Sequence, residues 1–270
     1  MLIRLEFSRN EKMMYLSHLD LMRMFSRAMR RGNIPIKYSS GYNPHAQMVF
    51  GLPLQLGVVA DADYLDIELD DPVCGGAGEG AGAVLHSNID LDGFAARLNA
   101  VLPDGLRVVG ARVKKTGDNA MAIITHATYE MRVGNGAGWY GNDILEADLK
   151  NTVAAFLEPG ERIVTKEAKP QPAGRRRGGD AIKKTMDLAP LVRFIDARGD
   201  VVAMTVRAGS VNNVKPGLVL ASLNDVWKKT CGDTCGAGGD RFVRLSLRRK
   251  GLFVEQGGVL LKLDDSAFCY

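Results

Sequence analysis

Residues 15–57 constrain the fold more than any other stretch, because they hold an unbroken helical pattern between strand-forming segments. Ser17 lies just before the pattern, and its hydroxyl can cap the first turn of a helix. Asp20, three positions later, can accept hydrogen bonds from the exposed amides of that turn and faces the positive end of the helix. The pattern ends at Arg31, because Gly32 stops a helix. We therefore expect a strand–helix–strand unit whose helix begins after Ser17.

The predicted helix has two chemically different faces, because residues three or four positions apart are neighbours on a helix. One face combines an imidazole with apolar side chains, at His18, Met22, Phe25 and Met29. Another face carries four guanidinium groups, at Arg23, Arg27, Arg30 and Arg31. This stripe of arginines can bind phosphate groups. The alternative is the solvated face of an ordinary surface helix.

A polar turn at 39–45 follows the helix and carries Tyr42, Asn43 and His45. If the turn folds back over the helix N-terminus, Tyr42 and His45 come close to His18. Two imidazoles in that position can act as acid and base, or hold a phosphate at the helix N-terminus. In the structural alternative, His18 caps the helix, and Asn43 and His45 hydrogen-bond the backbone of their own turn. We expect a structural role for His18 and a binding role for the turn.

These segments together form a long gapped pattern: SHLD at 17–20, YSSGYNPH at 38–45, PLQLG at 53–57 and YLDIEL at 64–69. In this pattern the chain resembles the family of uncharacterised proteins with a DUF2344-type domain, which are encoded beside a radical SAM protein or fused to one. Weaker similarities at 186–188, 209–211 and 215–216 extend the resemblance over most of the chain. The resemblance implies a radical SAM enzyme, on a separate chain, as the partner.

The first half has the predicted element order β-α-β-β-α-β. Its other elements are strands at 2–8, 63–69 and 106–113 and a helix at 90–102. With right-handed crossovers, this order gives an antiparallel sheet with both helices on one face, as in ferredoxin-like folds.

The second half repeats that order in its pattern. Its predicted elements are strands at 129–133, 162–167 and 241–247, helices at 142–157 and 216–227, and hairpins at 191–208 and 252–263. We therefore expect an α+β protein of two tandem ferredoxin-like (βαββαβ) modules with antiparallel sheets. The N-terminal module is 1–117, and the C-terminal module is 118–270 with a basic loop at 168–184.

The net charge of +4 is modest, so a case for nucleic-acid binding depends on local clusters of charge. Besides the helix stripe, basic residues cluster at Arg175, Arg176, Arg177, Lys183 and Lys184, and at Arg244, Arg248, Arg249 and Lys250. Such a surface binds RNA through its phosphates without reading sequence. The alternative is a solvated helix face with a flexible linker. The chain lacks an aromatic RNP signature, so base stacking on a sheet is not expected.

No pattern points to a cofactor or a metal. The four cysteines, Cys74, Cys231, Cys235 and Cys269, have neither disulfide-framework spacing nor the three-cysteine motif of a radical SAM cluster. Free thiols and a cytoplasmic location are therefore expected. No apolar run reaches the length of a membrane span, and the N-terminus reads as a strand rather than a signal peptide.

Tyr64, Asp66 and Glu68 alternate along one predicted strand and share one of its faces. Paired carboxylates can perform acid–base chemistry. An exposed face of an antiparallel sheet has the same pattern, and we expect this second arrangement.

The leading interpretation is a non-catalytic accessory module that presents a substrate, RNA foremost, to a separately encoded radical SAM enzyme. A first alternative is a metal-independent endoribonuclease of the double ferredoxin-like type that uses His18 or His45. A second alternative is a protein–protein scaffold without a nucleic-acid role. The candidate binding residues are His18, Asp20, Arg23, Arg27, Arg30, Arg31, Tyr42, Asn43, His45, Arg175, Arg176 and Arg177.

Overall fold

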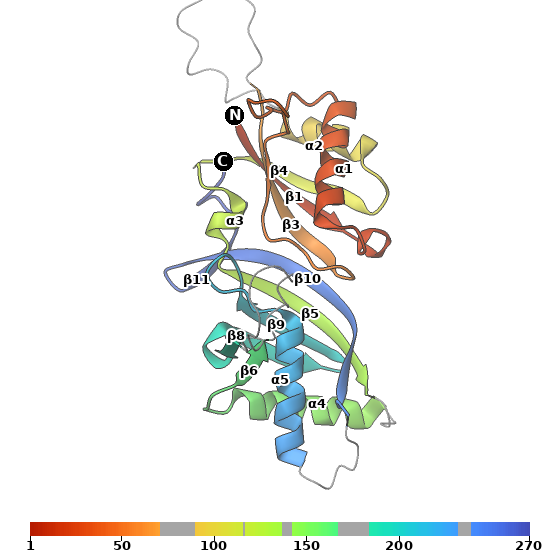
Figure 1. Ribbon diagram of the computed structural model, residues 1–270, viewed down its shortest axis with the longest axis vertical. Coiled ribbons are helices and arrows are strands. Elements are labelled where there is room, and N and C mark those ends of the chain that lie inside the picture. Colours follow the sequence, from red (N-terminus) through yellow and green to blue (C-terminus); the bar gives the residue numbers. More distant parts are fainter. Residues whose placement is uncertain (71–89, 116, 137–141, 167–183, 232–238) are drawn as a thin grey trace, which may run out of the picture. The chain divides into compact units, whose positions relative to one another are not determined.

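The computed structural model describes residues 1–70, 90–115, 117–136, 142–166, 184–231 and 239–270 (Figure 1). The chain divides into two compact units. Unit 1 consists of Met1–Ala127, Ala208–Val211 and Arg248–Tyr270, and unit 2 of Thr128–Arg207 and Asn212–Leu247. The chain thus returns to unit 1 near its C-terminus. A single boundary between 117 and 118, as predicted, assigns these C-terminal residues to the second module instead.

Unit 1 contains the N-terminal elements in the predicted order. They are β1 (Leu2–Arg9), the 3-10 helix η1 (Glu11–Met13), α1 (His18–Arg31), β2 (Met48–Phe50), β3 (Val59–Glu68), α2 (Leu91–Val101) and β4 (Leu106–Val113). A short helix, α3 (Ala120–Ile123), follows β4. β10 (Phe242–Gln256) supplies residues to both units, and β11 (Val259–Lys262) forms the predicted C-terminal hairpin with it.

The strands of unit 1 are mostly antiparallel. β1 lies between β4 and β3, and β2 pairs with the second half of β3, with Phe50 opposite Leu65. The order of these four strands is therefore β4-β1-β3-β2. The first half of β3 pairs in parallel with β10, where Arg248 lies opposite Val59.

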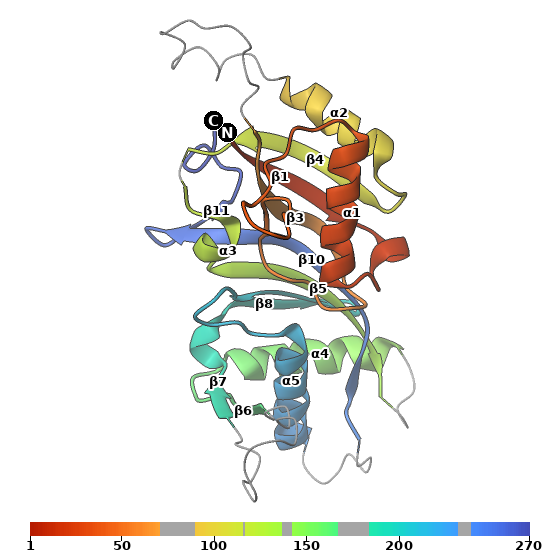
Figure 2. The ribbon, with the colours of Figure 1, turned by 45° about the horizontal axis from the view of Figure 1, so that its top comes forward.

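Helices α1 and α2 cover one face of these strands (Figure 2). The residues that α1 buries are Leu21, Phe25, Ala28 and Met29. The Phe25 ring meets Phe7 of β1 and Phe50 of β2 edge to face, with ring centroids 5.1 and 5.7 Å apart. This packing fixes the rotation of α1 about its axis and leaves its arginine stripe exposed.

The opposite face of β3 holds a buried ionic network around Asp66. Arg4 donates from Nε and Nη2 to the two Asp66 carboxylate oxygens, at 2.7 and 2.9 Å. Lys114 Nζ lies 3.0 Å from Asp66 Oδ2, and the Ala120 backbone N–H donates to the same oxygen at 2.7 Å. Asp66 is 4% exposed and Arg4 is 1% exposed. This carboxylate therefore holds two buried cations and the start of α3 together.

The prediction of an exposed face at Tyr64 and Asp66 is wrong. The C-terminal segment covers it: Arg4 Nη1 donates to the Leu263 carbonyl at 2.9 Å, and Tyr64 Oη donates to Asp264 Oδ1 at 2.8 Å. These partners lie 259 and 200 positions apart in the chain. The alternation within one strand does not show which distant segment packs on it.

Glu6 on β1 adds a titratable group to this face. Burial, followed by the nearby Asp264 carboxylate, raises the pKa of Glu6. A carboxyl group whose pKa is raised on folding favours the folded state at low pH, and this contribution is lost as the pH rises through the folded-state pKa.

We therefore expect Glu6→Gln to be more stable than the wild type at pH 7, with the difference vanishing near about pH 3, where Glu6 is protonated in both states. Urea unfolding of both proteins at the two pH values measures this difference. A variant that is less stable at pH 7, or equally shifted at both pH values, contradicts the assignment.

Unit 2 repeats strands and helices around its own core. Its main elements are β5 (His126–Asn135), α4 (Asn142–Leu157), β8 (Val192–Arg198), β9 (Val201–Arg207), α5 (Pro216–Cys231) and the first part of β10. The strand order is β10-β5-β9-β8, and β8 and β9 form the predicted antiparallel hairpin. The helix predicted at 142–157 is present as α4, and its apolar face is buried at Leu145, Leu149, Val153 and Phe156.

Unit 2 also has an insertion between α4 and β8. β6 (Ile163–Lys166) and β7 (Lys184–Asp187) form a separate two-stranded antiparallel sheet, followed by the 3-10 helix η2 (Ala189–Leu191). The strand predicted at 162–167 thus exists but does not join the main strands of unit 2.

An α+β architecture with mostly antiparallel strands is confirmed. In the portion of the chain described above, no helix is long and apolar enough to cross a membrane.

Candidate functional site

The start of α1 is fixed by the predicted cap. Ser17 Oγ accepts a hydrogen bond from the Asp20 backbone N–H at 3.2 Å and donates to Asp20 Oδ2 at 2.7 Å. The Ser17 hydroxyl, helped by Arg23, holds the pKa of Asp20 below its usual range. Asp20 is thereby engaged in the first turn of the helix, and Arg23 pairs with it at 3.1 Å.

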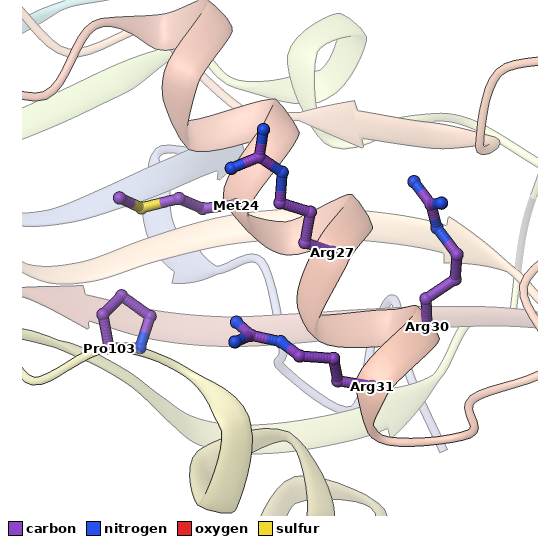
Figure 3. A pocket seen from close by; sticks show the side chains of 5 residues that line it. All are labelled: Met24, Arg27, Arg30, Arg31 and Pro103. Carbon is purple, nitrogen blue, oxygen red and sulfur yellow. The ribbon is translucent and has the colours of Figure 1, made fainter.

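The next two turns of α1 form one wall of a pocket of about 360 Å³ (Figure 3). We call this the arginine pocket, and its lining residues are Met24, Arg27, Arg30, Arg31 and Pro103. In Figure 3 the Arg31 side chain extends toward Pro103, which lies just after α2. Three of the four predicted stripe arginines therefore line one pocket, together with two apolar side chains.

The guanidinium groups of this pocket have few partners. Arg31 Nη2 donates to the Val101 carbonyl at 3.0 Å, at the C-terminal end of α2. Within the described ranges, Arg27 and Arg30 form no ion pair, and both are exposed. A helix C-terminus carries partial negative charge, so α2 helps to position Arg31, and no carboxylate of the described residues forms an ion pair with it.

A second pocket of about 470 Å³ adjoins the arginine pocket, and Pro103 lines both. We call this the polar pocket, and its lining residues are Ser8, Asn10, Asn99, Leu102, Pro103, Asp104, Gly105, Leu106 and Arg107. It lies at the turn between α2 and β4 and thus belongs to unit 1.

The two candidate histidines have separate surroundings. The His18 ring packs edge to face on Phe50, with centroids 5.4 Å apart, at the border of the core. His45 is exposed; its backbone N–H donates to Ser39 Oγ at 3.0 Å, and its Nδ1 lies 2.8 Å from the same hydroxyl. Among the residues with a described position, no hydrogen bond joins His18 to His45. Both of these His45 contacts are with the Ser39 hydroxyl of its own turn.

The other predicted residues of the turn are exposed. Tyr42 is 100% exposed, and Asn43 is also at the surface. Gly41 has φ of 145°, a conformation that favours glycine. Arg175, Arg176 and Arg177 lie outside the described residues.

Three of the four cations predicted as a basic cluster on β10 are paired with carboxylates, and the fourth, Arg244, is exposed. Arg249 is buried and donates to Asp63 Oδ1 at 2.8 Å. Arg248 and Lys250 both pair with Asp61, at 2.6 Å each. These cations therefore add little to a nucleic-acid surface, because carboxylates from β3 already hold them.

No group of three or more His, Cys, Asp or Glu side chains suited to a metal ion occurs in the described part of the chain. Cys269 is buried in unit 1, and burial raises the pKa of its thiol. Cys74 and Cys235 fall outside the described residues.

Sequence patterns indicated the arginines but not the pocket. The i, i+3, i+4 spacing places Arg27, Arg30 and Arg31 on one face of a helix from local geometry alone. Pro103 and the polar pocket come from the α2–β4 turn, about 70 residues away in the chain, as the separation of Arg31 from Val101 shows. The sequence of the short turn around Pro103 does not indicate which helix lies beside it.

Comparisons with known proteins agree with the sequence pattern on the family. Residues 2–216 match DUF2344, described as an uncharacterized protein conserved in bacteria. No curated protein matches the chain. A solved structure titled "Crystal Structure of a Cbf5-Nop10-Gar1 Complex" has a TM-score of 0.40 and 10% sequence identity, over 94% of this chain and 50% of that chain. The chain thus spans half the length of that structure's chain. Because the family match covers most of its residues, the chain belongs to the DUF2344 family.

Proposed function

We propose that the protein is a non-catalytic module that binds RNA and presents it to a separately encoded radical SAM enzyme. The observation that carries this proposal is the arginine pocket, where Arg27, Arg30 and Arg31 line one concave surface. Guanidinium groups stay charged at physiological pH and bind phosphate oxygens through paired N–H donors. A backbone of phosphates is the polyanion that such a surface suits.

The surroundings of the pocket favour an external anion. Arg31 is held by a carbonyl, and within the described residues Arg27 and Arg30 have no carboxylate partner. By contrast, Arg248, Arg249 and Lys250 of β10 already have carboxylate partners. Arg27 and Arg30 are therefore basic groups whose charge is available to a ligand.

The radical SAM partner is proposed from the SHLD and YSSGYNPH segments, which resemble proteins encoded beside such enzymes. The exposed turn with Tyr42 and His45 offers a surface for this contact. The proposal includes a cytoplasmic location, where such a partner and RNA occur together.

We also propose that each unit is a ferredoxin-like module. The orders β4-β1-β3-β2 and β10-β5-β9-β8 support this, because in both the first strand lies between the fourth and the third. The β6–β7 sheet is then an insertion in the second module.

The double variant Arg27→Ala/Arg30→Ala is expected to bind single-stranded RNA roughly 10- to 30-fold more weakly at about 0.1 M salt. The slope of log K against log salt concentration should also fall by about 1.4, since each lost phosphate contact on a single strand removes about 0.7. Fluorescence anisotropy over a salt series measures both quantities.

The matched control is Arg132→Ala/Arg198→Ala, which removes the same charge from two exposed arginines of unit 2. Its affinity should change by less than about twofold, because Asp200 and Asp196 already pair with these two arginines. Equal losses in the two double variants, or no RNA binding by the wild type, contradict the proposal.

The same preparations separate the alternatives. If the wild type cleaves the RNA, and His18→Ala or His45→Ala abolishes this cleavage, the endoribonuclease alternative is favoured. Co-purification of a radical SAM enzyme from lysate that persists after nuclease treatment, without any RNA binding, favours a protein–protein scaffold.

A further inference from the structure

The polar pocket beside the arginine pocket has a fixed shape. Gly105 has φ of 101°, and a Cβ at this position would lie 2.6 Å from Asn10 Oδ1, so only glycine fits without strain. The Asn10 backbone N–H also donates to the Gly105 carbonyl at 3.0 Å. These contacts hold the α2–β4 turn, with Asp104 on it, against the end of β1.

Most polar side chains of this pocket are already used by the protein. The Asn99 amide donates to the Val108 carbonyl at 2.9 Å and accepts from the Val108 N–H at 2.8 Å. Asn10 Oδ1 accepts from the Lys12 backbone N–H at 3.0 Å. The Asp104 carboxylate differs from these two amides, because its partner is a surface side chain.

Asp104 pairs with Lys12, and their side chains are 76% and 66% exposed. An exposed ion pair contributes little to stability, so a ligand can replace it at little cost. The hydrogen bond from Lys12, followed by its charge, keeps the pKa of Asp104 below its usual range. Asp104 is therefore an ionised carboxylate that only accepts hydrogen bonds.

A carboxylate at this position repels a phosphate but suits a neutral group with N–H donors. A nucleotide offers both chemistries at neighbouring points, a phosphate and a base edge. Guanine presents two adjacent donors, N1–H and the N2 amino group, which match the two oxygens of one carboxylate. In uracil the single N3–H lies between two carbonyl oxygens, which a carboxylate repels. Watson–Crick edges are accessible only in unpaired nucleotides.

We propose that the polar pocket reads an unpaired guanine through Asp104, while the arginine pocket holds an adjacent phosphate. This inference rests on the proposed RNA-binding function and names the class of nucleotide that the site selects. Pro103 lines both pockets and separates the phosphate contact from the base contact.

The test measures the affinity of the full chain for three oligonucleotides: oligouridine, the same strand with one central guanosine, and the same strand with inosine, which lacks the N2 amino group. The wild type should bind the guanosine strand roughly 5- to 50-fold more tightly than oligouridine, as expected for a bidentate base contact. Inosine should lose most of this preference. Pairing the guanosine strand with its complement should also remove it.

Asp104→Asn should reduce the guanosine preference to less than about twofold. Asp92→Asn is the matched control: it removes one negative charge from an exposed residue of α2, so it should raise the affinity for all three strands without changing their ratios.

An unchanged guanosine preference in Asp104→Asn, or no preference in the wild type, overturns the inference. In either case the RNA-binding proposal stands if Arg27→Ala/Arg30→Ala still weakens binding to all strands. If the wild type binds none of the strands, both proposals fail.

Discussion

Asp66→Asn is expected to lower the free energy of unfolding by about 3–5 kcal/mol, because it leaves two buried cations without their carboxylate. The Asp66 carboxylate accepts hydrogen bonds from Arg4 Nε and Nη2 at 2.7 and 2.9 Å and from the Ala120 N–H at 2.7 Å, and Lys114 Nζ lies 3.0 Å from it. Asparagine keeps the shape of the side chain but loses the charge and offers N–H donors to groups that are themselves donors. Urea denaturation followed by circular dichroism measures the change.

The control is Glu68→Gln, two positions along the same strand. Glu68 pairs with Lys37, and the two side chains are 34% and 47% exposed. Loss of such a pair should cost less than about 1 kcal/mol. If both variants lose similar stability, or Asp66→Asn loses less than about 1 kcal/mol, the network is not the main support of this face.

Phe25→Ala should lower the free energy of unfolding by about 3–5 kcal/mol, because it opens a cavity among close-packed rings. Phe25 is 0% exposed and lies at the centre of the contacts with Phe7 and Phe50. Since this side chain seats α1 on the strands, thermal loss of RNA binding should coincide with the lowered melting transition.

The matched control is Phe194→Ala on β8, where the same side chain is 49% exposed. The loss of stability should stay below about 1 kcal/mol, because the truncated ring already faces water. A Phe25→Ala protein with wild-type stability would show that α1 is held by other contacts.

Local chemistry in the sequence was sufficient to predict the start of α1 and its arginine stripe. The Ser17 cap and the stripe depend on residues within four positions of one another, where helix geometry is fixed. The β8–β9 hairpin and helix α4 follow for the same reason. The convergence of His18 and His45 stays a prediction.

The misread face of β3 shows the limit of such patterns. Alternation gave the correct two faces, but Leu65 and Asp66 are both buried, on opposite sides of the strand. A strand can be covered on one side only, or its second side can also be covered by a segment from late in the chain. Both kinds of strand show the same alternation when ion pairs fill the second interface.

By itself the sequence determined the α+β class, the family and the residues of the basic helix face, because each depends on short-range periodicity or on a linear motif. Tertiary structure alone decided which charges are available. It buried Arg249 against Asp63, paired Arg248 with Asp61, and left Arg27 and Arg30 in a pocket beside Pro103. The physical reason is that ion pairing and burial depend on distances between segments remote in the chain, which local patterns do not encode.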